Sequence, residues 1–438
     1  MIELNLLIGY FKNFFSKKII YNFFFIIVFI LFFRIFLNSY INIIGGGWAY
    51  NELFINYSGG IVRRGLFGHL FLELNKINGV NPIIFFGILF SLLYSFQIYI
   101  YYKILKKFSN FKFLIIFILF SPALLLFPIY ENDVYYVKDV LTNISILLHC
   151  YFIISRKEEF NYEKYNKFII FFLIPLLSIN LFNHENQFFF IPVHILFSLY
   201  IYELNNVKNV NRKYIYYLIT VIPVFFLLLN SGSWEKVYAI NNSISEFNVK
   251  INDQLAGNIN LAIGGFIKWH FFFQNIDKFL KFFISLILTF FVFYAIFGYI
   301  LNKKIFKIDR NIKNIYLLFF TPSLALFILA LDYGRNINLI LTHLISFYLI
   351  LQLDNSKFIK LYNNLSKNFL FRNFLILFLI FNSFMWFLPQ GGGYSGIATF
   401  TDNSTILKNT LLGEFREIFM IIYNFIDTNL FDLPRVIV

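Results

Sequence analysis

The sequence predicts an all-α polytopic membrane protein that crosses the bilayer about eleven times. The first observation is composition: 59% of the 438 residues are hydrophobic, 14% are charged, and the mean hydropathy is +0.69. A water-soluble fold of this length could not bury so much apolar surface in one core. The second is the regular recurrence of long apolar runs, and the third is the alternation of lysine and arginine between successive turns.

The predicted spans follow one another from residue 20 to residue 389. Each is close to the roughly 17–25 residues that a helix needs to cross a bilayer. They make residues 1–389 a transmembrane domain, in which residues 232–275 form a partial outer cap, and residues 390–438 a tail with an amphipathic helix. The spans are 20–38, 82–102, 113–130, 139–155, 168–183, 188–204, 214–231, 279–301, 315–331, 337–353 and 373–389.

The basic residues predict a cytoplasmic N-terminus and an extracytoplasmic C-terminus. The six segments that would then face the cytoplasm hold 23 of the 37 lysines and arginines. The short turns 131–139, 183–187 and 332–336, on the other side, hold only Lys138 and Arg335. Cytoplasmic loops carry such an excess of positive charge. We therefore expect a multi-pass protein of the bacterial cytoplasmic (inner) membrane.

The first outer loop holds an unusual group of polar residues beside glycines. Arg63, Arg64 and His69 lie in the run from Asn56 to His69, and the segment 62–74 has the pattern of an amphipathic helix lying in the membrane interface. Guanidinium groups beside glycines suit an anion such as phosphate. Glu52 precedes them, and it is either a general base for an acceptor hydroxyl or a loop carboxylate paired with Arg63 or Arg64.

The later outer turns carry further candidates. Glu131, Asp133 and Asp139 either hold a divalent cation such as Mg²⁺ or Mn²⁺, share acid and base duties, or form a solvated turn in which Lys138 pairs with Asp139. No other cofactor is indicated.

Two further turns complete the predicted outer site. His184 and Glu185 lie in a tight turn near the bilayer, where polar side chains are costly and therefore favour function. This pair alone is too small for a metal site. Asp332 and Arg335 form either a salt bridge or a phosphate clamp in which the aspartate orients the arginine.

Other features exclude classes of function. The net charge of +14 comes without a basic arm or a nucleic-acid-binding motif, so we expect lipid rather than nucleic acid as partner. Because the sequence has a single cysteine, Cys150, an internal disulfide is excluded, and we interpret Cys150 as a buried thiol. His194 and His343 lie in predicted spans and read as hydrogen-bonded packing residues. The spans otherwise carry few charges, which disfavours an ion-coupled carrier.

The arrangement of these residues resembles the GT-C class of integral membrane glycosyltransferases. In that class an outer loop with an interfacial helix and an acidic residue follows the first helix, as Glu52 and the segment 61–75 do here, and an acidic loop follows the third helix, as Glu131, Asp133 and Asp139 do. The resemblance covers roughly residues 1–230. It lacks the Trp-Trp-Asp signature of oligosaccharyl transferases, and its early acid is a single Glu.

The resemblance implies an inverting transfer of a sugar from a polyprenyl-phosphate or pyrophosphate donor to a glycan or lipid acceptor at the outer face. Glu52 or an acid of 131–139 would activate the acceptor, and Arg63, Arg64 and Arg335 would neutralise the departing lipid phosphate. The alternatives are a polymerase of O-antigen or capsule repeat units and a transporter or flippase of lipid-linked sugars.

Overall fold

The computed structural model describes fewer than all 438 residues, and the predicted spans 279–301 and 373–389 lie almost wholly outside its described part, as do most of the loop 232–275 and the tail 390–438. The described residues are 22, 24–33, 35, 48–108, 115, 117–119, 121, 123–130, 136–156, 159–205, 215–229, 233–247, 249–251, 322–323, 326, 333–351 and 373.

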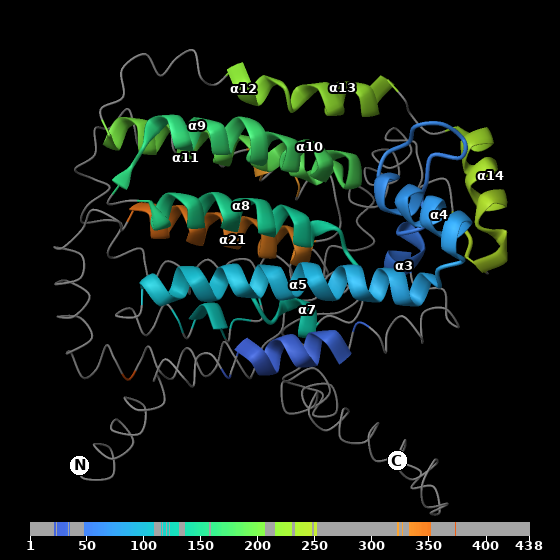
Figure 1. Ribbon diagram of the computed structural model, residues 1–438, viewed down its shortest axis with the longest axis horizontal. Helices are drawn as coiled ribbons and strands as arrows, with labels where there is room; N and C mark the ends of the chain where they lie inside the picture. Colours follow the sequence, from blue (N-terminus) through green and yellow to red (C-terminus); the bar gives the residue numbers. More distant parts are fainter. Residues whose placement is uncertain are drawn as a thin grey trace, which may run out of the picture.

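Within these residues the fold is helical, without a β-strand. Figure 1 shows the long helices lying roughly along one direction, with α3, α4 and α14 gathered at one end. The labelled helices are α3 (Trp48–Glu52), α4 (Leu66–Asn78), α5 (Pro82–Lys107), α7 (Phe127–Tyr130), α8 (Asp139–Ser155), α9 (Tyr162–Phe168), α10 (Ile174–Asn183), α11 (Ile191–Leu204), α12 (Ile215–Leu218), α13 (Val221–Leu229), α14 (Trp234–Ser243) and α21 (Tyr333–Leu351).

Among the described residues, three helical stretches are long and apolar enough to cross a membrane. The first is α5, the second joins α9 to α10 through a π-helical turn, Ile169–Leu173, and the third joins the 3₁₀ turn Glu185–Phe190 to α11. Shorter apolar helices cover Phe24–Phe33 and α8. The sequence prediction of a helical protein with membrane-crossing segments is therefore confirmed at this level.

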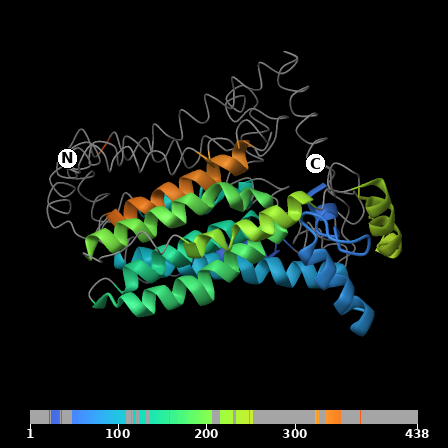
Figure 2. The same ribbon diagram turned by 90° about the horizontal axis from the view of Figure 1, so that it is seen from above.

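α8 is the centre of the bundle. It packs most extensively against α5 and α21, and Figure 2 shows the other long helices arranged around this group. Its polar residues Thr142, Asn143, Ser145 and His149 are buried together with its apolar ones. A helix that is buried on all sides cannot expose these groups to water, so each needs a partner inside the bundle.

Local signals explain where the helices begin and end. Asn81 accepts a hydrogen bond from the backbone N–H of Ile83 at 2.8 Å, and Pro82 follows as the first residue of α5. Gly79 adopts a φ of +59°, in the left-handed region, and ends α4 with a hydrogen bond from its N–H to the carbonyl of Asn75.

Two predicted spans are interrupted. Residues 123–126 form turns rather than the middle of a helix over 113–130, and the side chain of Ser121 accepts a hydrogen bond from the N–H of Ala123. The span predicted at 214–231 is divided into α12 and α13 by a turn at 219–220. In that turn Thr220 donates its hydroxyl to the carbonyl of Tyr217. Side-chain bonds of this kind compete with the helical ladder, which apolar periodicity does not reveal.

The predicted amphipathic helix of the first outer loop is present as α4. Phe67 and Phe71 face the core, whereas Leu70 and Leu74 are exposed. Gly68 lies where α4 crosses the preceding loop: a Cβ atom there would come within 2.2 Å of the carbonyl oxygen of Ile55. The close approach of these two backbones thus requires a glycine.

We predict that Gly68→Ala destabilises the protein, because the methyl group would collide with backbone that cannot rotate away. The expected loss is about 1–3 kcal/mol, as for other overpacked sites. Thermal unfolding of the detergent-solubilised protein, followed by size-exclusion chromatography, measures it. Leu70→Ala, at an exposed position of the same helix, is the control. If Gly68→Ala melts together with the wild type, the close packing of α4 is wrong.

Candidate functional site

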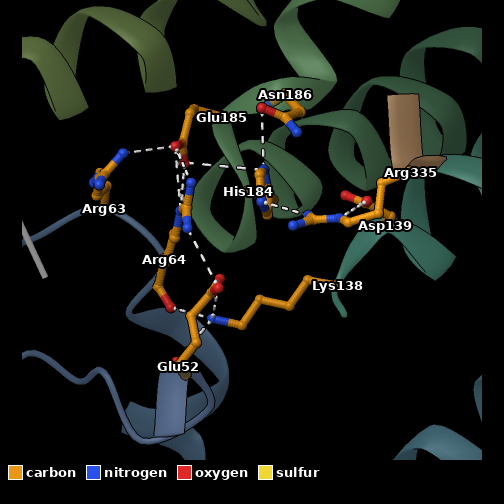
Figure 3. A network of polar contacts seen from close by, with 9 residues as sticks. All are labelled: Glu52, Arg63, Arg64, Lys138, Asp139, His184, Glu185, Asn186 and Arg335. Atoms are coloured by element: carbon orange, nitrogen blue, oxygen red, sulfur yellow. Dashed lines mark hydrogen bonds and ion pairs between the residues drawn. The ribbon is translucent and has the colours of Figure 1, made fainter. Parts of the chain in front are cut away.

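Four segments that are distant in the sequence meet at the end of the bundle that carries α3 and α4. They are the loop between α3 and α4, the start of α8, the turn between α10 and α11, and the first turn of α21. Figure 3 shows their polar side chains in one connected network. Its members are Glu52, Arg63, Arg64, Lys138, Asp139, His184, Glu185, Asn186 and Arg335.

Glu185 binds both arginines of the loop between α3 and α4. Arg63 donates from Nη1 to Glu185 Oε1 at 2.8 Å, and Arg64 donates from Nη2 to the same oxygen at 2.5 Å and from Nε to Oε2 at 3.0 Å. Arg64 has a φ of +65°, which costs a non-glycine residue energy. The ion pairs of its side chain compensate for this backbone conformation.

Glu52 joins the arginines to α8. Its carboxylate lies 3.3 Å from Arg64 Nη1 and 3.8 Å from Lys138 Nζ. Lys138 also donates to the carbonyl oxygen of Arg64 at 2.7 Å, so it closes the loop onto the start of α8. Burial raises the pKa of Glu52, but the charges of Arg64 and Lys138 outweigh burial and lower the pKa to about 2. Burial lowers the pKa of Lys138 to about 8, against the opposing charge of Glu52.

A second group of contacts lies beside this ion-pair cluster. Arg335 donates from Nε to Asp139 Oδ2 at 2.7 Å, and its Nη2 lies 3.1 Å from His184 Nε2. All three side chains are buried. The start of α8, the α10–α11 turn and the start of α21 thus converge on one point.

The protonation of His184 makes this point unusual. Burial and then the charge of Arg64 lower the pKa of His184 to about 4, so the imidazole is neutral at physiological pH and carries a single proton. Its Nδ1 lies 3.2 Å from the backbone nitrogen of Asn186, and its Nε2 lies 3.1 Å from Arg335 Nη2. A neutral imidazole accepts at only one nitrogen, and a guanidinium can only donate. When Nε2 accepts from Arg335, the ring proton is therefore on Nδ1, 4.0 Å from Glu185 Oε2.

Asp139 supplies an acceptor at the same place. Its Oδ2 is bonded to Arg335, but its Oδ1 is buried and has no hydrogen-bond partner among the described residues. A buried carboxylate oxygen without a partner is costly. The site therefore combines a guanidinium group with an open carboxylate oxygen, a combination that matches an anionic group together with a hydroxyl.

The loop between α3 and α4 and the start of α4 are held from two sides. Asn183, at the end of α10, accepts a hydrogen bond from the N–H of Phe67 at 3.2 Å. Lys236 on α14 donates to the carbonyl of Ile61 at 3.1 Å, just before the two arginines. α14 comes from the segment that the sequence predicts as a partial outer cap, and it contacts the loop that carries Arg63.

Most of the predicted site residues that the structure describes lie in this network. His69 instead lies against the ring of Tyr57, with 5.2 Å between the ring centroids. Lys138 pairs with Glu52, and not with Asp139 as one alternative had it. Sequence reasoning missed Lys138 as a member of the site, although a lysine at the start of a long apolar helix was a usable signal. The predicted Glu131, Asp133 and Asp332 lie outside the described residues.

The comparisons with known proteins leave this site without a precedent. No protein-family model matches the sequence, and no curated protein or solved structure is significantly similar to it. Within the described part of the chain, no three side chains of His, Cys, Asp or Glu are grouped to hold a metal ion. What the site does has to be argued from its own chemistry.

We predict that Glu52→Gln destabilises the protein by roughly 3–5 kcal/mol at neutral pH, because it removes the carboxylate nearest to the buried Lys138 and one of the two carboxylates that pair with Arg64. The pKa of Glu52 falls on folding, so its contribution is complete above pH 4.5 and is lost as the pH falls toward about 2. Thermal unfolding of the detergent-solubilised protein across this range measures both effects.

Glu73→Gln is the matched control, since Glu73 forms an exposed ion pair with Lys76 and such pairs contribute little. The wild type should lose more stability than Glu52→Gln between pH 4.5 and about 2. Parallel losses, with equal stability at neutral pH, would contradict a structural role for the Glu52 carboxylate.

Proposed function

We propose that this protein is a membrane glycosyltransferase of the GT-C type, which transfers a sugar from a polyprenyl-phosphate or pyrophosphate donor to a cell-envelope acceptor. The observation that carries the proposal is the buried Arg335 guanidinium, which donates to Asp139 Oδ2 and lies 3.1 Å from His184 Nε2, beside an Asp139 Oδ1 that has no partner among the described residues. A guanidinium suits the oxygens of a phosphate group, and the carboxylate oxygen suits the hydroxyl of an acceptor.

The reaction would be a single displacement at the anomeric carbon. The acceptor oxygen attacks this carbon while the bond to the lipid phosphate breaks, and the acceptor proton passes to Asp139 Oδ1. Arg335 stabilises the charge that develops on the departing phosphate, and His184 positions the guanidinium group. Attack opposite to the leaving group inverts the configuration of the sugar.

The ion-pair cluster would position these groups. The carboxylate of Glu52 is engaged by Arg64 and Lys138, and its pKa of about 2 makes it a poor proton acceptor at neutral pH. Burial raises the pKa of Asp139, but the charge of Arg335 outweighs burial and lowers the pKa, so the pKa does not distinguish the two acids. We assign the role of base to Asp139 because its Oδ1 has no partner among the described residues, and a positioning role to Glu52. Arg63 and Arg64 are held by Glu185 and would contribute positive charge at the rim of the site.

The distribution of charge supports an outer position for the site. The opposite end of the bundle exposes the basic residues Lys106, Lys107, Arg156 and Lys164 at the ends of α5, α8 and α9. Exposed lysines and arginines of this kind are typical of the cytoplasmic side. With that orientation, the buried cluster faces the compartment in which lipid-linked sugars are presented, and the protein resides in the bacterial inner membrane with about eleven spans.

We predict that Asp139→Asn reduces sugar transfer by about 10²–10⁴-fold, the usual contribution of a general base. The asparagine keeps the shape of the side chain but cannot take a proton. A strain deleted for the gene is complemented with wild type or variant, and its surface glycans and lipid-linked saccharides are compared by mass. Lys76→Gln, in the exposed ion pair of α4, is the control.

The same masses separate the alternatives. Loss of a transferase leaves a glycan that lacks one sugar, and loss of a polymerase leaves single repeat units. Loss of a flippase leaves complete lipid-linked saccharide on the cytoplasmic side of the membrane. Variants are compared only where membrane insertion equals the wild type. Complete glycan in the Asp139→Asn strain would refute the assignment of the base.

A further inference from the structure

A second set of polar side chains lies inside the bundle, away from the network of Figure 3, which we call the outer cluster. It consists of six side chains from α8, α9, α11 and α12, each at most 3% exposed. Every neighbouring pair is within hydrogen-bond distance, so the six form an unbranched sequence, which we call the buried chain. In order, its members are Tyr217, Ser198, Tyr165, His149, His194 and Ser145.

The first half of the buried chain is made of hydroxyl groups. The oxygen of Tyr217 lies 2.9 Å from Ser198 Oγ, and Ser198 Oγ lies 3.0 Å from the oxygen of Tyr165. The oxygen of Tyr165 lies 2.8 Å from His149 Nε2. These hydroxyls therefore reach one nitrogen of a buried histidine directly.

The second half passes through two imidazoles. The rings of His149 and His194 are nearly parallel, with an angle of 5° between them, and their Nδ1 atoms are 3.1 Å apart. His194 Nε2 lies 3.5 Å from Ser145 Oγ, and Ser145 can donate to the carbonyl of Thr142 at 2.8 Å. Each histidine thus has one partner on each ring nitrogen.

The buried chain can be protonated in two complete ways. In the first, every proton points from Tyr217 toward Ser145, so that His149 carries its proton on Nδ1 and His194 on Nε2. In the second, every proton points the other way: His194 carries its proton on Nδ1 and His149 on Nε2, and Tyr217 donates to the carbonyl of His194 at 3.3 Å. Hydroxyls and neutral imidazoles both donate and accept, so both patterns satisfy each member.

The surroundings favour neutral groups. Among the described residues, the other ionisable groups beside the histidines and Tyr165 are Cys150, Tyr202 and His343. Cys150 donates to the carbonyl of Ser346, and Tyr202 donates to Asn166. None of them is a carboxylate, a lysine or an arginine. A lasting positive charge on either imidazole would therefore be costly, whereas a proton that leaves as another arrives costs less.

We propose that the buried chain is a proton relay within the membrane. A hydronium ion gives a proton to Tyr217, each hydrogen-bonded proton then moves to the next member, and Ser145 gives its own proton to water. Because Tyr217 and Ser145 are both buried, the relay requires water to enter the bundle beside each of them. At every step one O–H or N–H bond breaks and one forms. The chain is neutral before and after, and the first pattern has become the second.

The relay lies between the outer cluster and the opposite end of the bundle. Ser145 follows Asp139 by six residues on α8, which corresponds to about 9 Å along the helix. Tyr165 lies on α9, which begins at the end of the bundle opposite the outer cluster (Figure 1). The relay thus lies deeper in the bundle than the outer site, and its activity is independent of the proposed sugar transfer.

Nitrogen NMR of the two histidines tests the relay. The full-length protein is labelled with ¹⁵N-histidine and reconstituted in liposomes, and a ¹⁵N–¹⁵N cross peak between the Nδ1 atoms identifies the pair without substitution. We expect both rings to populate both tautomers, with the fraction of Nδ1–H on His149 equal to that of Nε2–H on His194. A single fixed tautomer on each ring, or two doubly protonated rings, would overturn the proposal.

Two variants sharpen the test because each removes the hydrogen-bond partner of a different histidine: Tyr165 bonds His149 and Ser145 bonds His194. Tyr165→Phe should shift the pair toward Nδ1–H on His149, since the Ser145 end remains satisfied. Ser145→Ala should shift it toward Nδ1–H on His194, since the Tyr165 end remains. Tyr202→Phe, beside Tyr165 but outside the buried chain, should leave the populations unchanged. Shifts in the same direction from the first two variants would also refute the relay.

Discussion

Arg64 lies between two carboxylates, Glu52 and Glu185, and the rest of the outer cluster depends on this partly buried bridge. Removing charged groups from water costs free energy unless their geometry and hydrogen bonds compensate. The bridge meets this condition because Glu185 accepts from both arginines and Lys138 donates to the carbonyl of Arg64. It fastens the loop between α3 and α4 to the turn between α10 and α11, and so fixes where α4 lies.

This bridge also determines which carboxylate is available for chemistry. Glu52 is neutralised by two cations, whereas Asp139 has one oxygen bonded to Arg335 and one without a partner. The residue nearest in sequence to the arginines is thus the structural acid, and the residue at the start of α8 is the open one. Strong pairing stabilises a carboxylate but removes its basicity, so a site that needs both functions has to divide them between two residues.

The sequence was sufficient to predict a helical fold with segments apolar enough to cross a membrane, and most of the described members of the site, but not the partners of these residues. Apolar runs and basic turns placed Glu52, Arg64, His184 and Arg335 at one end of the bundle, where they do lie together (Figure 3). Which acid meets which base depends on the packing of α21 against α8, a contact between residues nearly two hundred positions apart. No local pattern encodes that contact.

The partners of buried side chains in the interior of the bundle could not be predicted from the sequence either. His194 was predicted to be a hydrogen-bonded packing residue, and it is hydrogen-bonded. Its partner His149 lies on another helix, and the spacing of the two residues in the sequence does not predict the pair.

The division between charged and neutral polar groups follows from the medium around them. The arginines, Lys138 and the carboxylates gather at the end of the helices, where paired charges can be solvated in part and compensated by one another. Deeper in the bundle, the polar groups of the buried chain are hydroxyls and imidazoles, which can each be satisfied without a net charge. A protein that crosses an apolar medium can therefore place ionic chemistry at its surface, but has to conduct any proton transfer in its core through neutral groups.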